Sequence, residues 1–199
     1  SILSWAIRMI RVVKRLGCAA SRLEEARIAA GRASVSLMSP TACTIIDELE
    51  QLLAESMPET FTTMASTSIE AHPPDPFPPE APLVAASVGF IGEVTGIVYI
   101  YVTDAFARVI TSRILGMPEP EIDGHEMVND AMGEMANMIV GQIKSRLCDR
   151  GRKCVFTIPS IVRGQNFCVE PVSGTHSRKV GFRAANHAIM AEILVKPSE

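Results

Sequence analysis

Apolar positions follow first a helical and then a strand period along this chain. Apolar residues recur at helical spacing over residues 39–64, behind a capping residue, Ser39, and with Pro40 at the first helical position. Pro58 removes a backbone donor and predicts a kink or a restart of that helix. Residues 83–102 then alternate and are rich in β-forming residues around a Gly-Glu turn, which predicts a β-hairpin.

Two further helices are indicated by their end signals. Thr103 can cap a short helix that ends near Gly116. Asp123, followed three residues later by Glu126, has the pattern of a capping box. Helical periodicity then continues to Gly151, a helix of about 25 residues or roughly 37 Å.

Short runs of β-forming residues follow the long helix and are separated by Gly, Pro and Asn. They occupy residues 153–158, 161–163, 167–172, 178–182 and 188–196. Consecutive hairpins imply one antiparallel sheet, on which the helices at 39–64 and 123–149 pack. The predicted fold class is therefore α+β, with an antiparallel β-sheet packed with two long helices.

Two segments lie outside this layered pattern. Residues 72–82 hold six of the thirteen prolines and predict an extended connector. Residues 1–16 have the pattern of a basic amphipathic helix, which could contact a membrane or a partner. We therefore expect a basic amphipathic N-terminal extension at 1–37 and a folded domain at 38–199 that carries the main function.

Composition and charge narrow the class of protein. The 199 residues are 47% hydrophobic, and no apolar run is long enough to span a bilayer. Residues 1–40 carry seven Lys and Arg against two Glu, so in a chain of net charge −3 the remainder holds −8. That acidic body argues against a nucleic-acid binder. The five cysteines include no zinc-ligand spacing and indicate reduced thiols in a cytoplasmic protein.

The predicted long helix has two unlike faces. One apolar stripe lies within an arc of about 120° and contains Val128, Met132, Met135, Ala136, Ile139, Ile143 and Leu147. Four residues within about 60° of one another form the opposite side, here called the ridge: Asp130, Glu134, Asn137 and Gly141. Gly133 and Gly141 each cost a helix about 1 kcal/mol relative to Ala. Packing of a neighbouring element could explain Gly133, and approach of another protein could explain Gly141.

The motif on this helix resembles a known one. Asp130-x-x-x-Glu134-x-x-Asn137, followed after twenty-one residues by Pro159, is similar to the motif of the CheX branch of the CheC/CheX/FliY family of chemotaxis phosphatases. The resemblance runs from about residue 38 to residue 196. It implies a CheC-like fold and dephosphorylation of a response regulator such as phosphorylated CheY.

The resemblance also implies roles for single residues. Glu134 would form a salt bridge to the regulator's active-site lysine, and Asn137 would position the attacking water. Asp130 and Gly141 are expected to support or contact the partner, and Pro159 to fix a loop. Mg²⁺ is expected on the regulator, with no cofactor bound by this chain.

Members similar to CheC carry a second copy of the motif on their first helix. The matching segment here, residues 56–62, has Glu59 but Thr62 in place of Asn, and Pro58 intrudes. We therefore expect one active motif, the CheX arrangement, which implies a homodimer built through the β-sheets.

Other functions remain as alternatives to the phosphatase. The domain could dock on a response regulator or flagellar switch without hydrolysis, or residues 1–16 could localise a membrane-associated regulator. The four histidines are scattered, so no Ser-His-Asp set or metal site is predicted. No phosphate-binding loop is present, and no nucleotide cofactor is expected.

Overall fold

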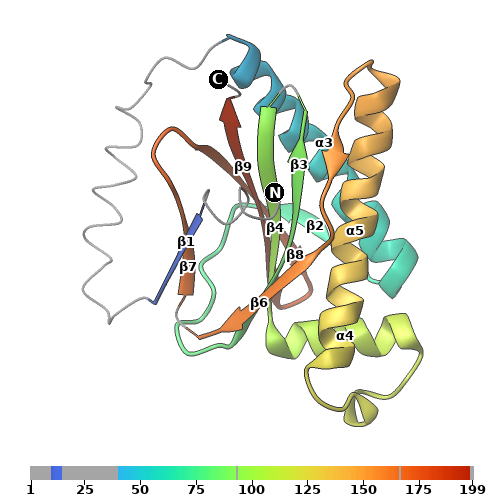
Figure 1. Cartoon of the computed structure of the whole chain (residues 1–199). Helices are drawn as coiled ribbons and strands as arrows, with labels where there is room; N and C mark the ends of the chain where they lie inside the picture. Colours follow the sequence, from blue (N-terminus) through green and yellow to red (C-terminus); the bar gives the residue numbers. More distant parts are fainter. Residues whose placement is uncertain (1–9, 15–39, 93, 166, 198–199) are drawn as a thin grey trace.

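An antiparallel sheet with helices on one face forms the body of the protein (Figure 1). The structure, a computed structural model, describes four stretches of the chain: residues 10–14, 40–92, 94–165 and 167–197. The seven strands of the sheet have the order β2-β8-β9-β4-β3-β5, with β6 also paired to β3. This confirms the α+β class and the antiparallel sheet.

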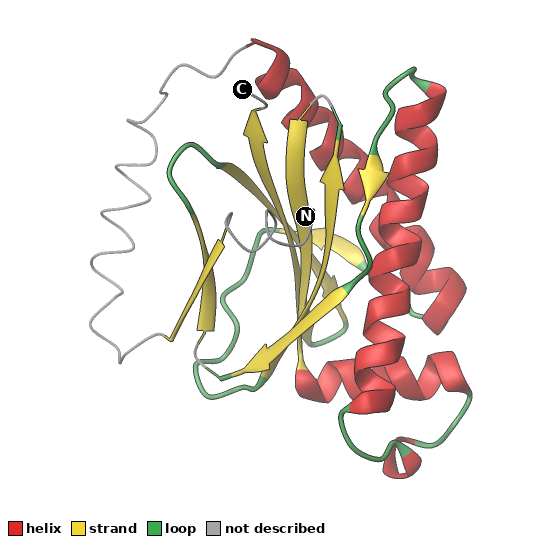
Figure 2. Cartoon of the chain, in the orientation of Figure 1, coloured by secondary structure: helices red, strands yellow, loops and turns green. Residues whose placement is uncertain are grey.

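The strands of this sheet are β2 (Glu70–His72), β3 (Leu83–Ile91), β4 (Val94–Thr103), β5 (Val155–Phe156), β6 (Ser160–Gly164), β8 (His176–Ala184) and β9 (His187–Pro197). The described α-helices are α3 (Pro40–Ala65), α4 (Asp104–Leu115) and α5 (Glu126–Asp149). A short 3₁₀-helix, η2 (Glu119–Glu121), precedes α5. Figure 2 shows the helices gathered on one side of the sheet.

The predicted hairpin and short helix are both confirmed. Strands β3 and β4 pair antiparallel over the predicted hairpin at 83–102. The Thr103 hydroxyl accepts a hydrogen bond from the Phe106 N–H at 3.3 Å and so caps α4. Gly116, with a left-handed φ of 65°, ends that helix.

The first long helix continues through its proline. α3 is a single helix in which Pro58 is an interior residue, so a restart of the helix at Pro58 is not observed. Met57 and Phe61 on either side of the proline are both fully buried. Their packing keeps the helical path where one backbone hydrogen bond is missing. Ser39, the predicted cap, lies outside the described residues.

The second long helix begins later than predicted. α5 starts at Glu126, and its capping residue His125 makes no side-chain capping hydrogen bond. The capping-box interpretation of Asp123 and Glu126 is therefore wrong. Gly124, with a left-handed φ of 65°, turns the chain between these two residues and keeps Asp123 out of the helix.

Part of the predicted N-terminal helix is a strand. β1 (Ile10–Lys14) pairs antiparallel with β7 (Phe167–Pro171) in a separate two-stranded sheet. The helix predicted at 1–16 is thus wrong over 10–14; the rest of that segment lies outside the described residues. Three of the five β1 residues are β-branched, which favours a strand. The hydrogen bonds of this strand go to β7, a partner that the local sequence pattern does not reveal.

The proline-rich connector crosses one face of the sheet. β2, which was too short to be predicted from alternation, pairs with β8 and leads into the connector. A Cβ atom at Gly181 on β8 would lie 2.4 Å from the His72 carbonyl oxygen and 2.6 Å from the Pro74 nitrogen. Gly181 therefore permits the connector to approach the sheet closely.

Both faces of the sheet are buried. The main core lies between the sheet and the helices, and a second apolar cluster on the other face contains Ala85, Ile97, Tyr99, Tyr101, Val169 and Leu194. Glu192 is 3% exposed, and its carboxylate accepts a hydrogen bond from the Tyr101 hydroxyl at 3.0 Å. None of the described helices is both long and apolar enough to cross a membrane.

The buried carboxylate generates a prediction about stability. Burial raises the pKa of Glu192 above its ordinary value, although Lys179 and the Tyr101 hydrogen bond oppose the shift. Because the folded-state pKa is the higher one, the wild type loses stability as the pH rises through it. Glu192→Gln should therefore be more stable than the wild type at neutral pH, and the two proteins should converge in acid. Urea unfolding of both proteins across the pH range checks this, and parallel stability curves would contradict it.

Candidate functional site

Helix α5 is held in place by one apolar face. All seven residues of the predicted stripe are buried, which confirms that prediction. They pack into the main core together with α3, α4 and the sheet. Burial of a whole helix face fixes the rotation of α5 about its axis, and with it the direction of the opposite face.

Ion pairs tie α5 to α3 along one side. The Arg146 guanidinium contacts the carboxylates of Glu55 at 2.5 Å and Glu59 at 3.0 Å. Near the end of α5, Arg150 contacts Glu48 at 2.7 Å. Each pair is partly exposed and contributes little stability alone, but together they resist sliding of the two helices.

The segment that matches the second copy of the motif, residues 56–62, takes part in these ion pairs through Glu59. Glu59, its only acidic residue, lies against Arg146 of the same chain. Ser56 and Thr60 in the same segment are buried. That residues 56–62 form no second working site stays a prediction.

The ridge lies on the exposed face of α5, as predicted. All four of its residues are exposed: Asp130, Glu134, Asn137 and Gly141. Within the described part of the chain, the side chains of Asp130, Glu134 and Asn137 make no hydrogen bond or ion pair. The ridge extends for about 16 Å at 1.5 Å per residue. It presents carboxylates and an amide whose hydrogen-bonding capacity is directed to solvent.

A polar network that the sequence did not reveal fixes the beginning of α5. Arg163 on β6 donates a hydrogen bond to the Asn129 side-chain oxygen at 2.6 Å and pairs with Asp104 at the start of α4. Arg108 contacts the same Asp104 at 3.3 Å. Asn129 immediately precedes the first ridge residue. The contacts of Arg163 join elements that are distant in the sequence, so no local pattern predicts them, whereas Asp104 and Arg108 are four residues apart on one helix.

The loop around Pro159 packs on α5. A Cβ atom at Gly133 would lie 3.7 Å from the Cβ atom of Pro159, so the loop covers the helix one residue before Glu134. This is an ordinary van der Waals distance, so the side chain of alanine would also fit and the loop does not by itself require glycine at position 133. No atom lies within 4 Å of the corresponding position at Gly141, which leaves that end of the ridge open. Pro159 thus lies close to the ridge, and its role in fixing the loop stays a prediction.

A groove adjoins the ridge. It has a volume of about 530 Å³ and is lined by Asn137, Met138, Val140, Gly141, Gln142, Lys144, Ser145, Phe156 and Thr157. Two ridge residues, Asn137 and Gly141, therefore belong to the wall of a concave surface. Helix α5 supplies most of the lining, and the segment containing β5 supplies the rest.

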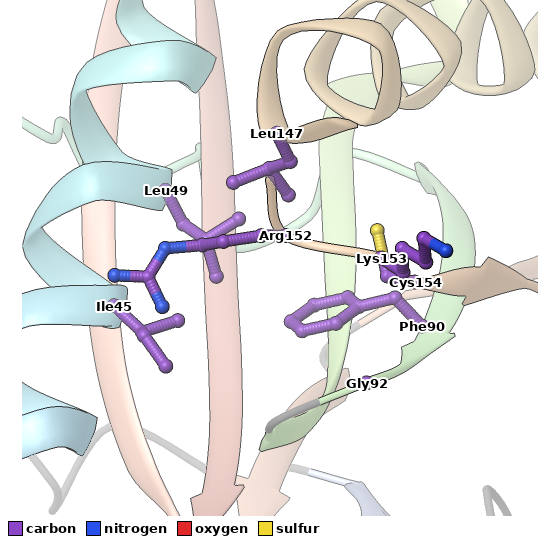
Figure 3. A pocket seen from close by; sticks show the side chains of 8 residues that line it. All are labelled: Ile45, Leu49, Phe90, Gly92, Leu147, Arg152, Lys153 and Cys154. Atoms are coloured by element: carbon purple, nitrogen blue, oxygen red, sulfur yellow. The ribbon is translucent and has the colours of Figure 1, made fainter. Parts of the chain in front are cut away.

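A second pocket has a different character (Figure 3). It has a volume of about 30 Å³, is mainly apolar, and lies between the ends of α3, β3 and α5. Burial, with a smaller effect of Cys148, raises the pKa of the Cys154 thiol that lines it. The thiol form is poorly suited to nucleophilic catalysis. A space of this size holds a water molecule but no substrate.

Together these features define an α+β domain with a polar ridge on a helix that its buried face and several ion pairs hold in place. A family model described as chemotaxis phosphatase CheX matches residues 84–183, and the chain belongs to this family. The matched region includes the hairpin, α4, α5 and the ridge. The resemblance seen in the sequence is therefore confirmed. A comparison with curated proteins gives no significant match.

Solved structures show the same fold. The chemotaxis protein CheX from Desulfovibrio desulfuricans is 22% identical, with a TM-score of 0.63 over 75% of this chain and 99% of the other. A chain of the CheX-CheY-BeF3-Mg²⁺ complex from Borrelia burgdorferi is 21% identical, with a TM-score of 0.58 over 73% and 96%. FliY from Thermotoga maritima is 13% identical, with a TM-score of 0.52 over 81% and 92%. The CheC-like fold is thereby confirmed.

The open end of the ridge generates a prediction about stability. Gly141→Ala should raise the free energy of unfolding by about 1 kcal/mol, because Ala is the better helix former and nothing crowds the added methyl group. Gly124→Ala is the matched control: its surroundings are equally open, but its φ of 65° strains any side chain, so stability should fall. Chemical denaturation measures both. A loss of stability in Gly141→Ala would show that Gly141 is required by the fold itself.

Proposed function

We propose that this protein removes the phosphoryl group from the phosphorylated aspartate of a CheY-type response regulator. The observation that carries the proposal is the pair Glu134 and Asn137, exposed, unpaired among the described residues and one turn apart on a clamped helix. The pair lies in a chain of the chemotaxis phosphatase CheX family. The regulator's phosphorylated site would meet the ridge.

Asn137 is proposed to position the attacking water. Hydrolysis of an aspartyl phosphate needs a water in line with the bond that breaks: a new P–O bond forms to the water oxygen, and the aspartate carboxylate leaves. The amide carbonyl can accept a hydrogen bond from this water, and the amide NH₂ can donate to a phosphoryl oxygen. An uncharged amide does this without repelling the phosphoryl group. Asn137 therefore supplies geometry, not covalent chemistry.

Glu134 is proposed to pair with the lysine of the regulator's active site. It lies three residues before Asn137, on the same side of the helix and about 4.5 Å away along the axis. A carboxylate that meets a lysine in a closed interface fixes the register of the two proteins, and its loss leaves the lysine unpaired and so weakens binding. The pair would thus set the position at which the Asn137 amide reaches the phosphoryl group.

Asp130 and Gly141 are proposed to contact the partner at the two ends of the ridge. Asp130 is exposed and unpaired among the described residues. It directly follows Asn129, whose side-chain oxygen accepts a hydrogen bond from Arg163. Gly141 leaves its surroundings open for a close approach of the regulator's backbone.

The metal and the phosphorylated aspartate would both belong to the regulator. Mg²⁺ bound there would neutralise charge on the transferred phosphoryl group, and this chain would bind no cofactor of its own. We place the reaction in the cytoplasm, with a basic accessory segment at 1–37 and the phosphatase domain at 38–199. Contact of residues 1–16 with a membrane is not part of the proposed mechanism.

We also propose that the protein is a homodimer built through its β-sheets, as the family resemblance implies. Sheet edges present unpaired backbone groups that a second chain can use. Light scattering on the purified full chain tests this: a molar mass of one chain over the working concentration range would contradict it.

The alternative is a docking module that binds the regulator without hydrolysing the phosphoryl group. An exposed amide at mid-helix has no evident purpose in such a module, because Asn lowers helix stability relative to Ala. This favours the phosphatase, and activity measurements distinguish the two.

Asn137→Ala should remove most of the phosphatase activity but leave binding of the regulator nearly unchanged. Loss of one group that acts on the transition state should lower the rate of phosphate release by about 10²-fold or more. Asn137→Asp should also be slow, because its charge repels the phosphoryl group. Phosphate release from a phosphorylated CheY-type regulator with Mg²⁺ is the measurement. Asn186→Ala, an exposed amide in the β8–β9 turn, is the matched control.

Two results would contradict this account. An Asn137→Ala variant as fast as the wild type would remove the assigned role of the amide. A wild type that binds the regulator but does not accelerate release would establish the docking module instead.

Glu134→Gln should act mainly on binding. Loss of the carboxylate removes the partner for the regulator's lysine, so KM should rise by about tenfold with a smaller change in kcat. Glu126→Gln, an exposed carboxylate at the start of the same helix, should leave KM unchanged. Steady-state kinetics against the concentration of phosphorylated regulator give both constants; an equal rise in KM for the two variants would show a nonspecific charge effect.

A further inference from the structure

Exposed apolar side chains are concentrated beside the ridge. Among the described residues, the large hydrophobic side chains that are exposed are Leu115 at 45%, Met138 at 40%, Val155 at 61% and Ile158 at 74%. Met138 follows Asn137 on α5 and lines the groove. Val155 and Ile158 flank Phe156 and Thr157, which line the same groove from the other side. Only Leu115 lies elsewhere, at the end of α4.

The segment that carries Ile158 is held on both sides. The Thr157 N–H donates to the Gly89 carbonyl at 2.9 Å, and the Gly89 N–H donates to the Thr157 hydroxyl at 2.9 Å. On the other side Pro159 packs on Gly133 of α5. Ile158 is therefore a largely exposed apolar side chain on a backbone that is held on both sides. Such a side chain loses little conformational freedom on binding, which favours a role as an anchor in an interface.

The far end of the groove carries a positive charge. The Lys144 ammonium lies 5.9 Å from the centre of the Phe156 ring. It has no carboxylate partner among the described residues. Along α5 the exposed charge thus changes from the carboxylates of Asp130 and Glu134, through the neutral Asn137, to a cation about 15 Å beyond Glu134.

We propose that the groove and Ile158 form the surface that recognises the response regulator, through an apolar side chain with a neighbouring carboxylate beside the regulator's phosphorylated site. The apolar side chain would enter the groove between Met138 and Phe156 and contact Ile158. The carboxylate would pair with Lys144. This inference rests on the proposed function, and it assigns selection of the partner to residues other than Glu134 and Asn137.

Continuity with the ridge identifies the occupant. Asn137 and Gly141 belong to both the ridge and the groove, so a protein that brings a phosphoryl group to Asn137 also covers the groove. A specific interface covers about 800 Å² on each partner, which is far more than the four ridge residues provide. The surface next to them combines apolar side chains, such as Met138 and Phe156, with polar ones and the charge of Lys144, a mixture that is common in protein interfaces.

The test measures affinity and catalysis separately. The probe is a CheY-type regulator loaded with Mg²⁺ and beryllofluoride for binding, and the phosphorylated regulator for turnover. Ile158→Ser should weaken binding by about tenfold and raise KM to match, with kcat within about twofold of the wild type. Leu115→Ser is the matched control, an exposed apolar residue away from the ridge, and should change neither constant. Thermal unfolding should be unaltered in Ile158→Ser, because the side chain is exposed.

Lys144→Glu tests the charge. Binding should weaken by about tenfold at low ionic strength, and the difference from the wild type should shrink as salt is added. A loss that is independent of salt would contradict the proposed ion pair.

The outcomes separate this inference from the proposed function. If Ile158→Ser and Lys144→Glu bind and turn over the regulator like the wild type while Asn137→Ala is inactive, the phosphatase stands and the docking surface is wrong. If the wild type binds the loaded regulator without hydrolysing the phosphorylated one, and both variants bind weakly, the surface stands and the phosphatase is wrong. If the variants change only the molar mass of the protein and not its affinity, the surface joins two copies of this chain, which overturns the inference.

Discussion

Burial of one face of α5 is the constraint on which the remaining structure depends. The stripe from Val128 to Leu147 packs between α3, α4 and the sheet, so the helix cannot rotate without exposing apolar surface. A helix fixed in this way also fixes its opposite face. Glu134 and Asn137 are therefore held on one line by the core, although their side chains make no hydrogen bond or ion pair with the described part of the chain.

Contacts on three sides of α5 hold the ridge in the same position. Arg146 connects the helix to α3, Arg163 connects its beginning to β6 and α4, and Pro159 covers Gly133. Each contact contributes little energy alone, but together they limit small movements of α5 and so keep the side chains of Glu134 and Asn137 in position. The proposed chemistry needs no more from this chain than such positioning, because the regulator would supply the metal, the lysine and the phosphorylated aspartate.

Helical and strand periodicity predicted the parts of the molecule that are local. The apolar stripe and the ridge of α5 follow from a period of 3.6 residues, and the hairpin of β3 and β4 from alternation. Contacts across long stretches of sequence were not predictable. Strand β1 has an amphipathic pattern that a helix also satisfies, and its partner β7 lies about 150 residues away. The pairing of Arg163 with Asp104, and the place of Ile158 beside α5, depend on the folded arrangement in the same way.

A structure of this protein bound to its regulator, with Mg²⁺ and beryllofluoride in place of the phosphoryl group, tests the central claim most directly. We expect the Asn137 amide to lie within about 3 to 4 Å of the beryllofluoride or of the water in line with it. We also expect the Glu134 carboxylate to contact the regulator's active-site lysine. A complex in which the regulator binds elsewhere and the ridge of α5 faces solvent would contradict the account.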